Sequence, residues 1–412
     1  MKNNRVFIQI AAYRDPELIP TINDCLSKAK FPENLVFSIA WQHSSDDGWD
    51  NLDAFANDPR FKIIDIDYKE SKGACWARNR LQQQYTDEEY TLQLDSHHRF
   101  IAGWDQELIA MHEQLKSMGH EKPLITSYAP SYNPNNDPPE RMTYPCKMNF
   151  GHFMPEGAIF FLPVKIENHD ALTEPIPARF YSAHFAFAGG DFVREVPHDP
   201  ELYFHGEEIS IAARAYTWGY DLFHPHIPIV WHEYTRSNKI KHWDDDAEWC
   251  TKNSSSHIRT RKLFEMDGFA KDIDFGVYDF GPKRTLADYE RYAGISFKRR
   301  SANKHTIEHR LPPGPESDDE FFTFKHCINL NKDQFSKTTD YDFWAIIYED
   351  EVGTSLYRRD CSESEIQVYL NASDETMMCI NSEFYSSKQP SKWIVWPHSK
   401  SQGWLTKMEK CI

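Results

Sequence analysis

The chain has 412 residues, which is enough for two or more domains with sizeable buried cores. Its formal net charge of −17 excludes a general surface for nucleic acid or for anionic membranes. The eight cysteines are scattered, so we expect reduced and mostly buried thiols. No apolar run approaches the ~18 residues of a membrane span, and we therefore expect a cytoplasmic protein with no membrane span.

The first third of the chain alternates between apolar runs and segments with helical periodicity. This order predicts an α/β fold with a doubly wound sheet, whose ligands gather at the carboxyl ends of the strands. The loops that would share this rim are 12–15, 42–48 and 95–98. The expected strands are 6–11, 35–42, 61–66 and 90–94, and the expected helices are 17–29 and 104–118.

The fourth expected strand ends in Asp95-Ser-His97. On an extended backbone, residues two apart project from one face, so the carboxylate and the imidazole would point the same way. This pair suits a divalent ion such as Mn²⁺, which accepts oxygen and nitrogen ligands. The alternative is an aspartate that caps the next turn beside histidines that face the solvent.

A second candidate follows the third strand, where Gly73 allows a tight turn and a helix begins. Arg78 lies about one and a half turns into that helix, where it could reach a phosphate or simply be solvated. The strand before it ends in Asp65-Ile-Asp67, a competing metal candidate that we interpret as a polar strand end.

Beyond residue 150, expected strands at 157–163 and 179–188 precede an amphipathic helix within 202–219. The second strand ends in Gly189-Gly190, which allows close approach of a ligand or a plain tight turn. Glu207 and Glu208 lie in the first helical turn, where acidic residues also favour the helix dipole. A last strand ends near His232, which is either a third metal ligand or a core histidine.

Taken together, these motifs resemble the retaining, metal-dependent glycosyltransferases of the GT-A fold over about residues 5–240. The closest likeness is to the Skp1-hydroxyproline N-acetylglucosaminyltransferase family, and the polypeptide N-acetylgalactosaminyltransferases are more distantly similar. The resemblance implies a metal site at Asp95, His97 and His232, and catalytic roles for Glu207 and Glu208. It implies donor-binding positions at Ala11, Ala12, Tyr13, Arg14, Asp15, Gly73, Arg78, Gly189 and Gly190.

The resemblance also implies a chemistry. A bound Mn²⁺ or Mg²⁺ would stabilise the UDP leaving group, and UDP-GlcNAc would be the donor for a hydroxyl on a protein or glycan acceptor. The glutamates would orient hydroxyl groups, and neither is expected to act as a base. Two alternatives stay open: a transferase that uses another nucleotide sugar in bacterial surface-polysaccharide assembly, and a sugar-binding protein without activity on the same fold.

The likeness fades beyond about residue 240, where the acidic run 243–246 is interpreted as a solvated face. We expect a GT-A domain over 1–310, a Pro-rich linker over 311–320 and a small β-sandwich domain over 321–412. Acceptor binding, dimerisation and stabilisation all remain open as roles for that last domain. The strands expected in it are 321–330, 343–348, 366–370, 377–380 and 393–396.

Overall fold

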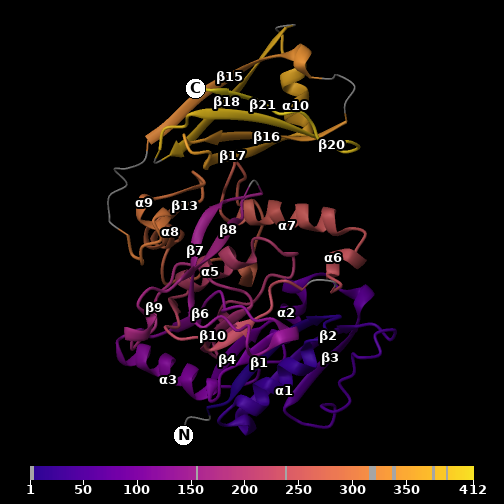
Figure 1. The fold of residues 1–412 in the computed structure, drawn as a ribbon, viewed down its shortest axis with the longest axis vertical. Coiled ribbons are helices and arrows are strands. Elements are labelled where there is room, and N and C mark those ends of the chain that lie inside the picture. The colour runs from indigo at the N-terminus through magenta and orange to yellow at the C-terminus, as the bar shows by residue number, and fades with distance from the viewer. Residues whose placement is uncertain are drawn as a thin grey trace.

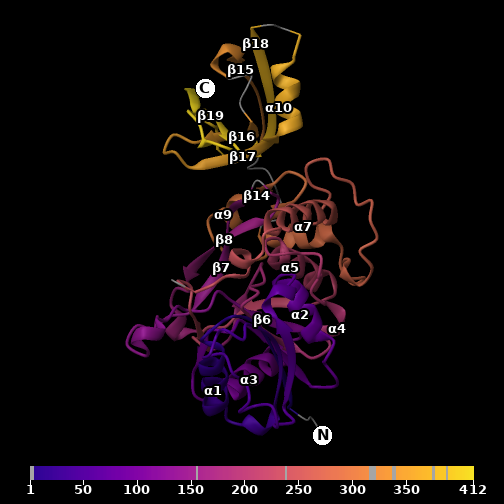
Figure 2. The same ribbon diagram turned by 90° about the vertical axis from the view of Figure 1, so that its right-hand side faces the viewer.

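A computed structural model describes residues 4–154, 156–236, 239–314, 322–335, 340–373, 376–386 and 388–412. The chain forms a large α/β part and a smaller β-rich part, which lies beyond the β7–β8 hairpin and α7 at one end of the long axis (Figures 1 and 2). The α/β class of the prediction is confirmed, with a large mixed sheet and additional sheets toward the C-terminus. The boundaries at residues 310 and 321 remain a proposal, and residues 315–320 of the expected linker lie outside the described residues.

The central sheet has eight strands in the order β3-β2-β1-β4-β10-β6-β11-β9. The first four in this order are mutually parallel, whereas β10 runs antiparallel to both β4 and β6. The strands are β1 (Val6–Tyr13), β2 (Leu35–His43), β3 (Phe61–Asp67), β4 (Tyr90–Leu94), β6 (Pro123–Thr126), β9 (Ile176–Pro177), β10 (Phe185–Gly189) and β11 (Asp221–His224). The carboxyl ends of β1, β2 and β4 therefore form one edge.

Helices cover both faces of this sheet because the side chains of β1 alternate between two cores. Val6, Ile8 and Ile10 pack with α1 (Leu18–Lys28) and α3 (Trp104–Ser117). The opposite face packs against α2 (Ala74–Gln82), whose Ala77 and Leu81 contact β2 and β3. The remaining helices of the α/β part are α4 (Phe192–Glu195), α5 (Glu207–Thr217), α6 (His242–Asp245), α7 (Trp249–Leu263), α8 (Leu286–Ala293) and α9 (Lys304–Ile307).

Within the described α/β part, three two-stranded ladders lie outside the central sheet. The pairing of β5 (His98–Phe100) with β12 (Val230–His232) brings two distant segments to the carboxyl edge. The other two ladders are β7 (Cys146–Phe153) with β8 (Ile159–Lys165), and β13 (Ile295–Ser296) with β14 (Ser301–Ala302).

The C-terminal part is a sandwich of two sheets around one apolar core, as expected. One segment differs from prediction, because 366–370 belongs to the helix α10 (Glu363–Leu370). Ser362 and Glu365 form a reciprocal capping box at its start, and this local signal outweighs the β-branched content that suggested a strand. The strands are β15 (Phe322–Asn331), β16 (Tyr341–Glu349), β17 (Ser355–Ser362), β18 (Met377–Ser386), β19 (Lys392–Ser399), β20 (Gly403–Trp404) and β21 (Met408–Cys411).

The cysteines depart from the expectation in one pair. Cys327 and Cys379 form a disulfide between β15 and β18, with their Cα atoms 5.9 Å apart. The 52 positions between them hide this proximity in the sequence. Four of the free thiols are buried, in agreement with the expectation. Among the described residues, no helix has the length and apolar character to cross a membrane.

Candidate active site

Three loops meet at the carboxyl edge of the parallel strands. The Nε and Nη2 atoms of Arg14, after β1, donate to the two carboxylate oxygens of Asp47, after β2, at 2.7 and 3.0 Å. Asp15 Oδ2 lies 2.7 Å from Nδ1 of His97, which follows β4. The loops that the sequence placed on one rim are therefore in direct contact.

Asp95, His97 and His232 form a compact group on this rim. One donor atom of each lies within 4.8 Å of those of the other two. Nε2 of His232 is 3.4 Å from Asp95 Oδ2, and Nε2 of His97 is 3.9 Å from the same oxygen. The two imidazoles and the carboxylate therefore converge around one point.

His232 reaches this point although it lies 135 positions after His97. The reason is the short ladder between β5 and β12, in which His232 pairs directly with His98. His232 is buried and its Nδ1 has no hydrogen-bond partner within the described part of the chain. Its Nε2 lies within hydrogen-bond distance of Asp95 Oδ2, a contact open both to a metal ligand and to a core histidine.

Asp15 lies behind His97 and not on the open rim. Its carboxylate is buried and accepts hydrogen bonds from Ser96 Oγ at 2.6 Å and from His97 Nδ1 at 2.7 Å. The side chain of Asp15 is therefore turned away from the position predicted for donor contact. A proton on Nδ1 leaves the Nε2 lone pair of His97 free to bind a metal ion.

The charge states suit a cation. Burial lowers the pKa of His232 well below its usual range, and the neighbouring histidines lower it further. Burial alone would raise the pKa of Asp95, but the hydrogen bond from His232 and the charge of Arg78 hold it well below normal. A neutral imidazole and an ionised carboxylate are the forms that bind metal.

Arg78 is buried between two carboxylates. Its Nη2 donates to Asp95 Oδ1 at 2.8 Å and its Nη1 donates to Glu207 Oε1 at 2.5 Å. The expected contact of Arg78 with a nucleotide phosphate stays a prediction, and in this structure each Nη atom donates to one of these carboxylates. Arg78 thereby links the start of α5 to the end of β4.

A second group, Cys75, His198 and Glu207, also has donor atoms within 4.8 Å of one another. Its chemistry suits a hydrogen-bond network better than a metal ion. Burial raises the pKa of the Cys75 thiol well above normal, and the charge of Glu207 raises it further. The thiol therefore stays protonated and donates to Glu207 Oε2 at 2.5 Å, whereas a metal requires a thiolate.

Glu208 follows Glu207 in the first turn of α5 and is held as a neutral acid. Burial raises its pKa to about 8, and the charge of Glu207 adds to the effect. Its Oε1 accepts from the backbone N–H of Ala183 at 3.0 Å. A protonated carboxyl can donate a hydrogen bond to a hydroxyl oxygen.

This protonation predicts a dependence of stability on pH. The ordinary carboxyl pKa of 4.5 applies to Glu208 in the unfolded chain, so the folded protein binds an extra proton between about pH 4.5 and 8. The stability that Glu208 contributes is therefore complete below pH 4.5 and lost as the pH rises through 8. We expect the free energy of urea unfolding of the wild-type protein to fall between pH 5 and 9 when it is compared with that of Glu208→Gln at the same pH. Parallel curves for the two proteins would contradict the assignment.

Gly189 and Gly190 require a correction. Because β10 is antiparallel to β4, Gly189 pairs with Tyr90 at the start of β4, at the edge opposite Asp95. A Cβ at Gly190 would lie 2.1 Å from the backbone oxygen of Glu88, so this glycine serves close packing of the chain. The predicted contact of these glycines with a sugar is therefore wrong in this arrangement.

The start of β10 faces the site instead. The ring of His184 lies 4.3 Å from that of His232, and Tyr234 Oη is 3.2 Å from His184 Nε2. His184, Tyr234 and His98 were not predicted from the sequence as site residues. In the sequence, His184 is marked only by its position just before an expected strand. This position indicates a site residue only when the direction of the strand in the sheet is known.

The remaining predicted positions lie toward the end of β1 and at the start of α2. Ala11 and Ala12 end β1, and Gly73 precedes α2 with a φ of +108°. Tyr13 and Arg14 both contact Asp245, at 2.8 and 3.1 Å. The acidic run 243–246 is thus in contact with the rim and is not simply a solvated face.

The pairing of Asp15 with His97 predicts an effect on metal affinity. In Asp15→Asn, a neutral amide replaces the carboxylate that accepts from both Ser96 Oγ and His97 Nδ1. The His97 ring therefore loses the contact that fixes its tautomer. We expect calorimetric titration with MnCl₂ to show affinity weakened by about 10- to 100-fold. Asp47→Asn is the matched control on the same rim, because Asp47 contacts Arg14 and none of the three ligands. Equal losses in both variants would contradict the role of Asp15.

Comparison with known proteins identifies the family. The family model described as "Glycosyltransferase (GlcNAc)" matches residues 5–58 and 50–299. The chain belongs to this glycosyltransferase family. The matched residues include the rim, the converging side chains of Asp95, His97 and His232, and α5. A comparison with curated protein sequences finds no match.

Among solved structures, GalNAc-T7 with UDP, GalNAc and Mn²⁺ aligns with a TM-score of 0.49 and 13% identity. The alignment covers 63% of this chain and 49% of GalNAc-T7, so the chain spans about half of that structure. TarS of S. aureus, residues 1–349 with UDP-GlcNAc, aligns with a TM-score of 0.36 and 12% identity over 66% of this chain and 76% of that one. The longer TarS structure aligns at 0.38 and 11% identity, over 99% and 77% of the two chains.

Proposed function

We propose that this glycosyltransferase moves N-acetylglucosamine from UDP-GlcNAc to a hydroxyl of a protein or glycan acceptor, with Mn²⁺ or Mg²⁺ and retention of anomeric configuration. The family description names GlcNAc and supports this donor. The sequence likeness to the Skp1-hydroxyproline N-acetylglucosaminyltransferases supports hydroxyproline, serine or threonine as the accepting residue.

The observation that carries the metal is the convergence of Asp95, His97 and His232. The hydrogen bond between Asp15 and His97 Nδ1 directs Nε2 of His97 toward that point. One carboxylate and two imidazoles fit Mn²⁺ better than Mg²⁺, which prefers oxygen ligands, and positions remain for phosphate oxygens. When bound there, the ion supplies electrostatic stabilisation of the leaving diphosphate.

The residues around this point have roles that follow from their contacts. The ends of β1 and β2, with Tyr13 and Arg14, form the wall that we assign to the uridine. Arg78 fixes Asp95 relative to Glu207 through its two Nη atoms. The protonated Glu208 is placed to donate to a sugar or acceptor hydroxyl.

The arrangement of the two glutamates favours attack by the acceptor hydroxyl on the face from which UDP departs. Glu207 is bound by Arg78 and Cys75, and Glu208 carries a proton. Neither is therefore a free carboxylate of the kind that a covalent glycosyl-enzyme mechanism uses. We propose that the departing phosphate accepts the proton of the attacking hydroxyl.

A donor panel tests the proposal. The purified chain is incubated with UDP-GlcNAc, UDP-GalNAc, UDP-glucose and GDP-mannose, with MnCl₂ or with EDTA, and nucleotide release is measured. We expect release from UDP-GlcNAc to exceed release from the others and to stop with EDTA. Preference for another nucleotide sugar would overturn the donor, and full release in EDTA would overturn the metal.

A further inference from the structure

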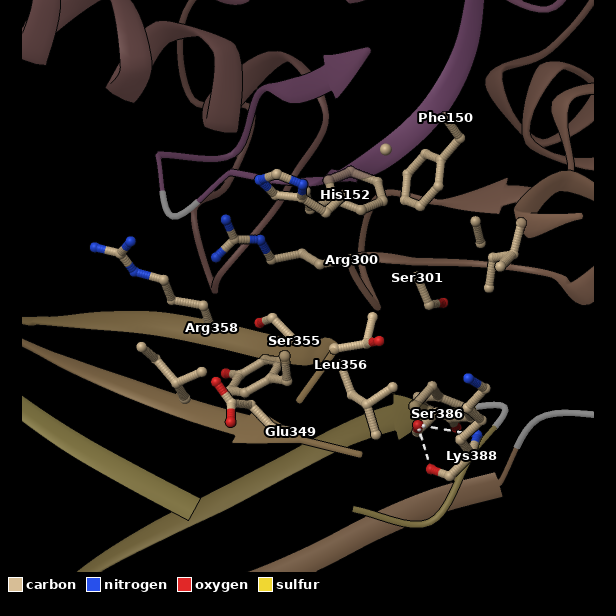
Figure 3. A pocket seen from close by; sticks show the side chains of 18 residues that line it. Phe150, His152, Arg300, Ser301, Glu349, Ser355, Leu356, Arg358, Ser386 and Lys388 are labelled. Carbon is tan, nitrogen blue, oxygen red and sulfur yellow. Dashed lines mark hydrogen bonds between the residues drawn. The ribbon is translucent and has the colours of Figure 1, made fainter. Parts of the chain in front are cut away.

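A cleft separate from the candidate active site lies between the α/β part and the C-terminal sandwich. It has a volume of about 480 Å³, which is within the range of ligand-binding pockets. One wall comes from the end of β7 and from the β13–β14 hairpin, and the other comes from β16, β17 and the end of β18 (Figure 3). Both parts of the chain are therefore needed to form it.

The lining of this cleft is positively charged in a strongly acidic chain. Arg300, Arg358 and Lys388 line it together with Glu349. Outside the lining, each of the three cations has one carboxylate partner, namely Asp267, Asp360 and Asp350. The whole chain has a formal net charge of −17. A cationic cleft in such a protein attracts anions locally, because clefts focus the field of the charges that line them.

Arg300 is the most informative of the three cations. Its side chain is only 6% exposed, and its Nε has no hydrogen-bond partner among the described residues. One Nη atom donates to the backbone oxygen of Met154, and the other lies 3.6 Å from Asp267. A buried guanidinium with a free N–H is costly without a ligand, so this arginine points to one.

Arg358 approaches from the opposite wall. Asp360 holds it from outside the lining through two hydrogen bonds of 3.0 and 3.1 Å. Although they come from opposite walls, the guanidinium groups of Arg300 and Arg358 lie toward the same end of the cleft, with the ring of His152 above Arg300 (Figure 3). Burial lowers the pKa of His152, and the charge of Arg358 lowers it further, so this ring is neutral near pH 7. Two fixed cations thus lie beside an imidazole that can exchange hydrogen bonds with hydroxyl groups.

The rest of the lining suits a polyhydroxylated ligand. Ser301 and Ser355 add hydroxyl groups to the lining, and Leu356 adds an apolar surface (Figure 3). The hydroxyl of Ser386 is engaged by the backbone oxygen and N–H of Lys388. Lys388 closes the far end, where its Nζ is 2.9 Å from Asp350 and its side chain is 60% exposed. Cations and hydroxyls beside a larger apolar surface, which includes Phe150, Phe153 and Ile307, together match a sugar unit that carries an acidic group.

We propose that this cleft binds an anionic saccharide unit of the acceptor, with a carboxylate or phosphate group held by Arg300 and Arg358. The inference rests on the proposed transfer to an acceptor and adds the chemical class of that acceptor. Because the cleft joins the two parts of the chain, the C-terminal sandwich takes part in acceptor recognition.

The test uses three probes on the full chain: glucuronate for a carboxylate, glucose 1-phosphate for a phosphate, and glucose as the neutral control. Binding is measured by ligand-observed NMR and by calorimetry. We expect glucuronate or glucose 1-phosphate to bind at least about tenfold more tightly than glucose, since hydrogen bonds to charged groups are the stronger ones. The preferred probe identifies which acidic group the cleft takes.

Two variants locate the binding. Arg358→Gln is expected to weaken the preferred probe by about tenfold or more, and Lys388→Gln by less, because Lys388 is more exposed. Lys388→Gln also guards against misfolding, because its side chain lies largely in solvent. Lys400→Gln is the matched control on the same domain, since Lys400 contacts Glu363 outside the cleft, and it should bind the probe as wild type does.

Equal binding of glucose and the acidic probes, or unchanged binding in Arg358→Gln, would overturn the inference. UDP release by the wild-type protein without acceptor is measured in parallel. Donor hydrolysis without any binding of an acidic probe contradicts the cleft alone. Acidic-probe binding without hydrolysis of any nucleotide sugar contradicts the proposed function.

Discussion

Replacing Asp95 with alanine is expected to lower transfer from UDP-GlcNAc by about 10²- to 10³-fold, since metal stabilisation of a leaving group contributes several kcal/mol. The carboxylate is the one charged ligand of the proposed site, and both imidazoles approach it. The fold should persist, because Asp95 lies on the rim and Arg78 keeps its contact with Glu207. The measurement is the initial rate of UDP release with acceptor, at saturating MnCl₂.

Asp65→Ala is the matched control for this loss. Asp65 is also a carboxylate near the carboxyl end of a parallel strand, but its side chain is 71% exposed and pairs with His43. Its removal should leave the rate nearly unchanged. A comparable loss in Asp65→Ala, or near-normal transfer by Asp95→Ala, would contradict the assignment of the metal site.

The second large effect concerns stability. Arg78→Ala is expected to destabilise the fold by about 3–5 kcal/mol, because it leaves the buried Glu207 carboxylate without its cation. Urea unfolding followed by circular dichroism measures this difference. In the double variant Arg78→Met with Glu207→Gln, the Arg78–Glu207 charge pair is removed while Asp95 keeps its charge. The part of the stability lost to the unpaired Glu207 should return while transfer stays lost.

Arg80→Ala provides the control on the same helix. Arg80 lies two residues further along α2, where its guanidinium is 5.1 Å from the Trp76 ring, and the expected loss is about 1 kcal/mol or less. Equal destabilisation by Arg80→Ala and Arg78→Ala would show that the loss comes from the helix and not from the buried ion pair. A double variant as unstable as Arg78→Ala would contradict the same account.

Sequence reasoning performed best where the signal was local. The apolar runs of β1, β2 and β4 and the helical periodicity of α3 each reflect a single segment, and the structure has them close to the expected positions. The shared rim followed from a general property of parallel strands. The error at α10 arose because a capping box is only four residues long and was outweighed by Ile366 and Val368.

The features that sequence reasoning missed depend on partners far along the chain. The direction of β10 decides whether Gly189 or His184 faces the site, and an isolated strand carries no mark of its direction. The pairing of Asp15 with His97 joins residues 82 positions apart, and that of Arg78 with Glu207 spans 129. His232 was placed by resemblance to a family and not by any spacing.

Anomalous diffraction at the manganese edge, from crystals grown with MnCl₂ and UDP, tests the central claim most directly. The account predicts one strong peak bonded to an oxygen of Asp95 and to Nε2 of His97 and His232, at roughly 2.0–2.3 Å. A peak at Cys75, His198 and Glu207, or His232 further than about 3 Å from the ion, would contradict it.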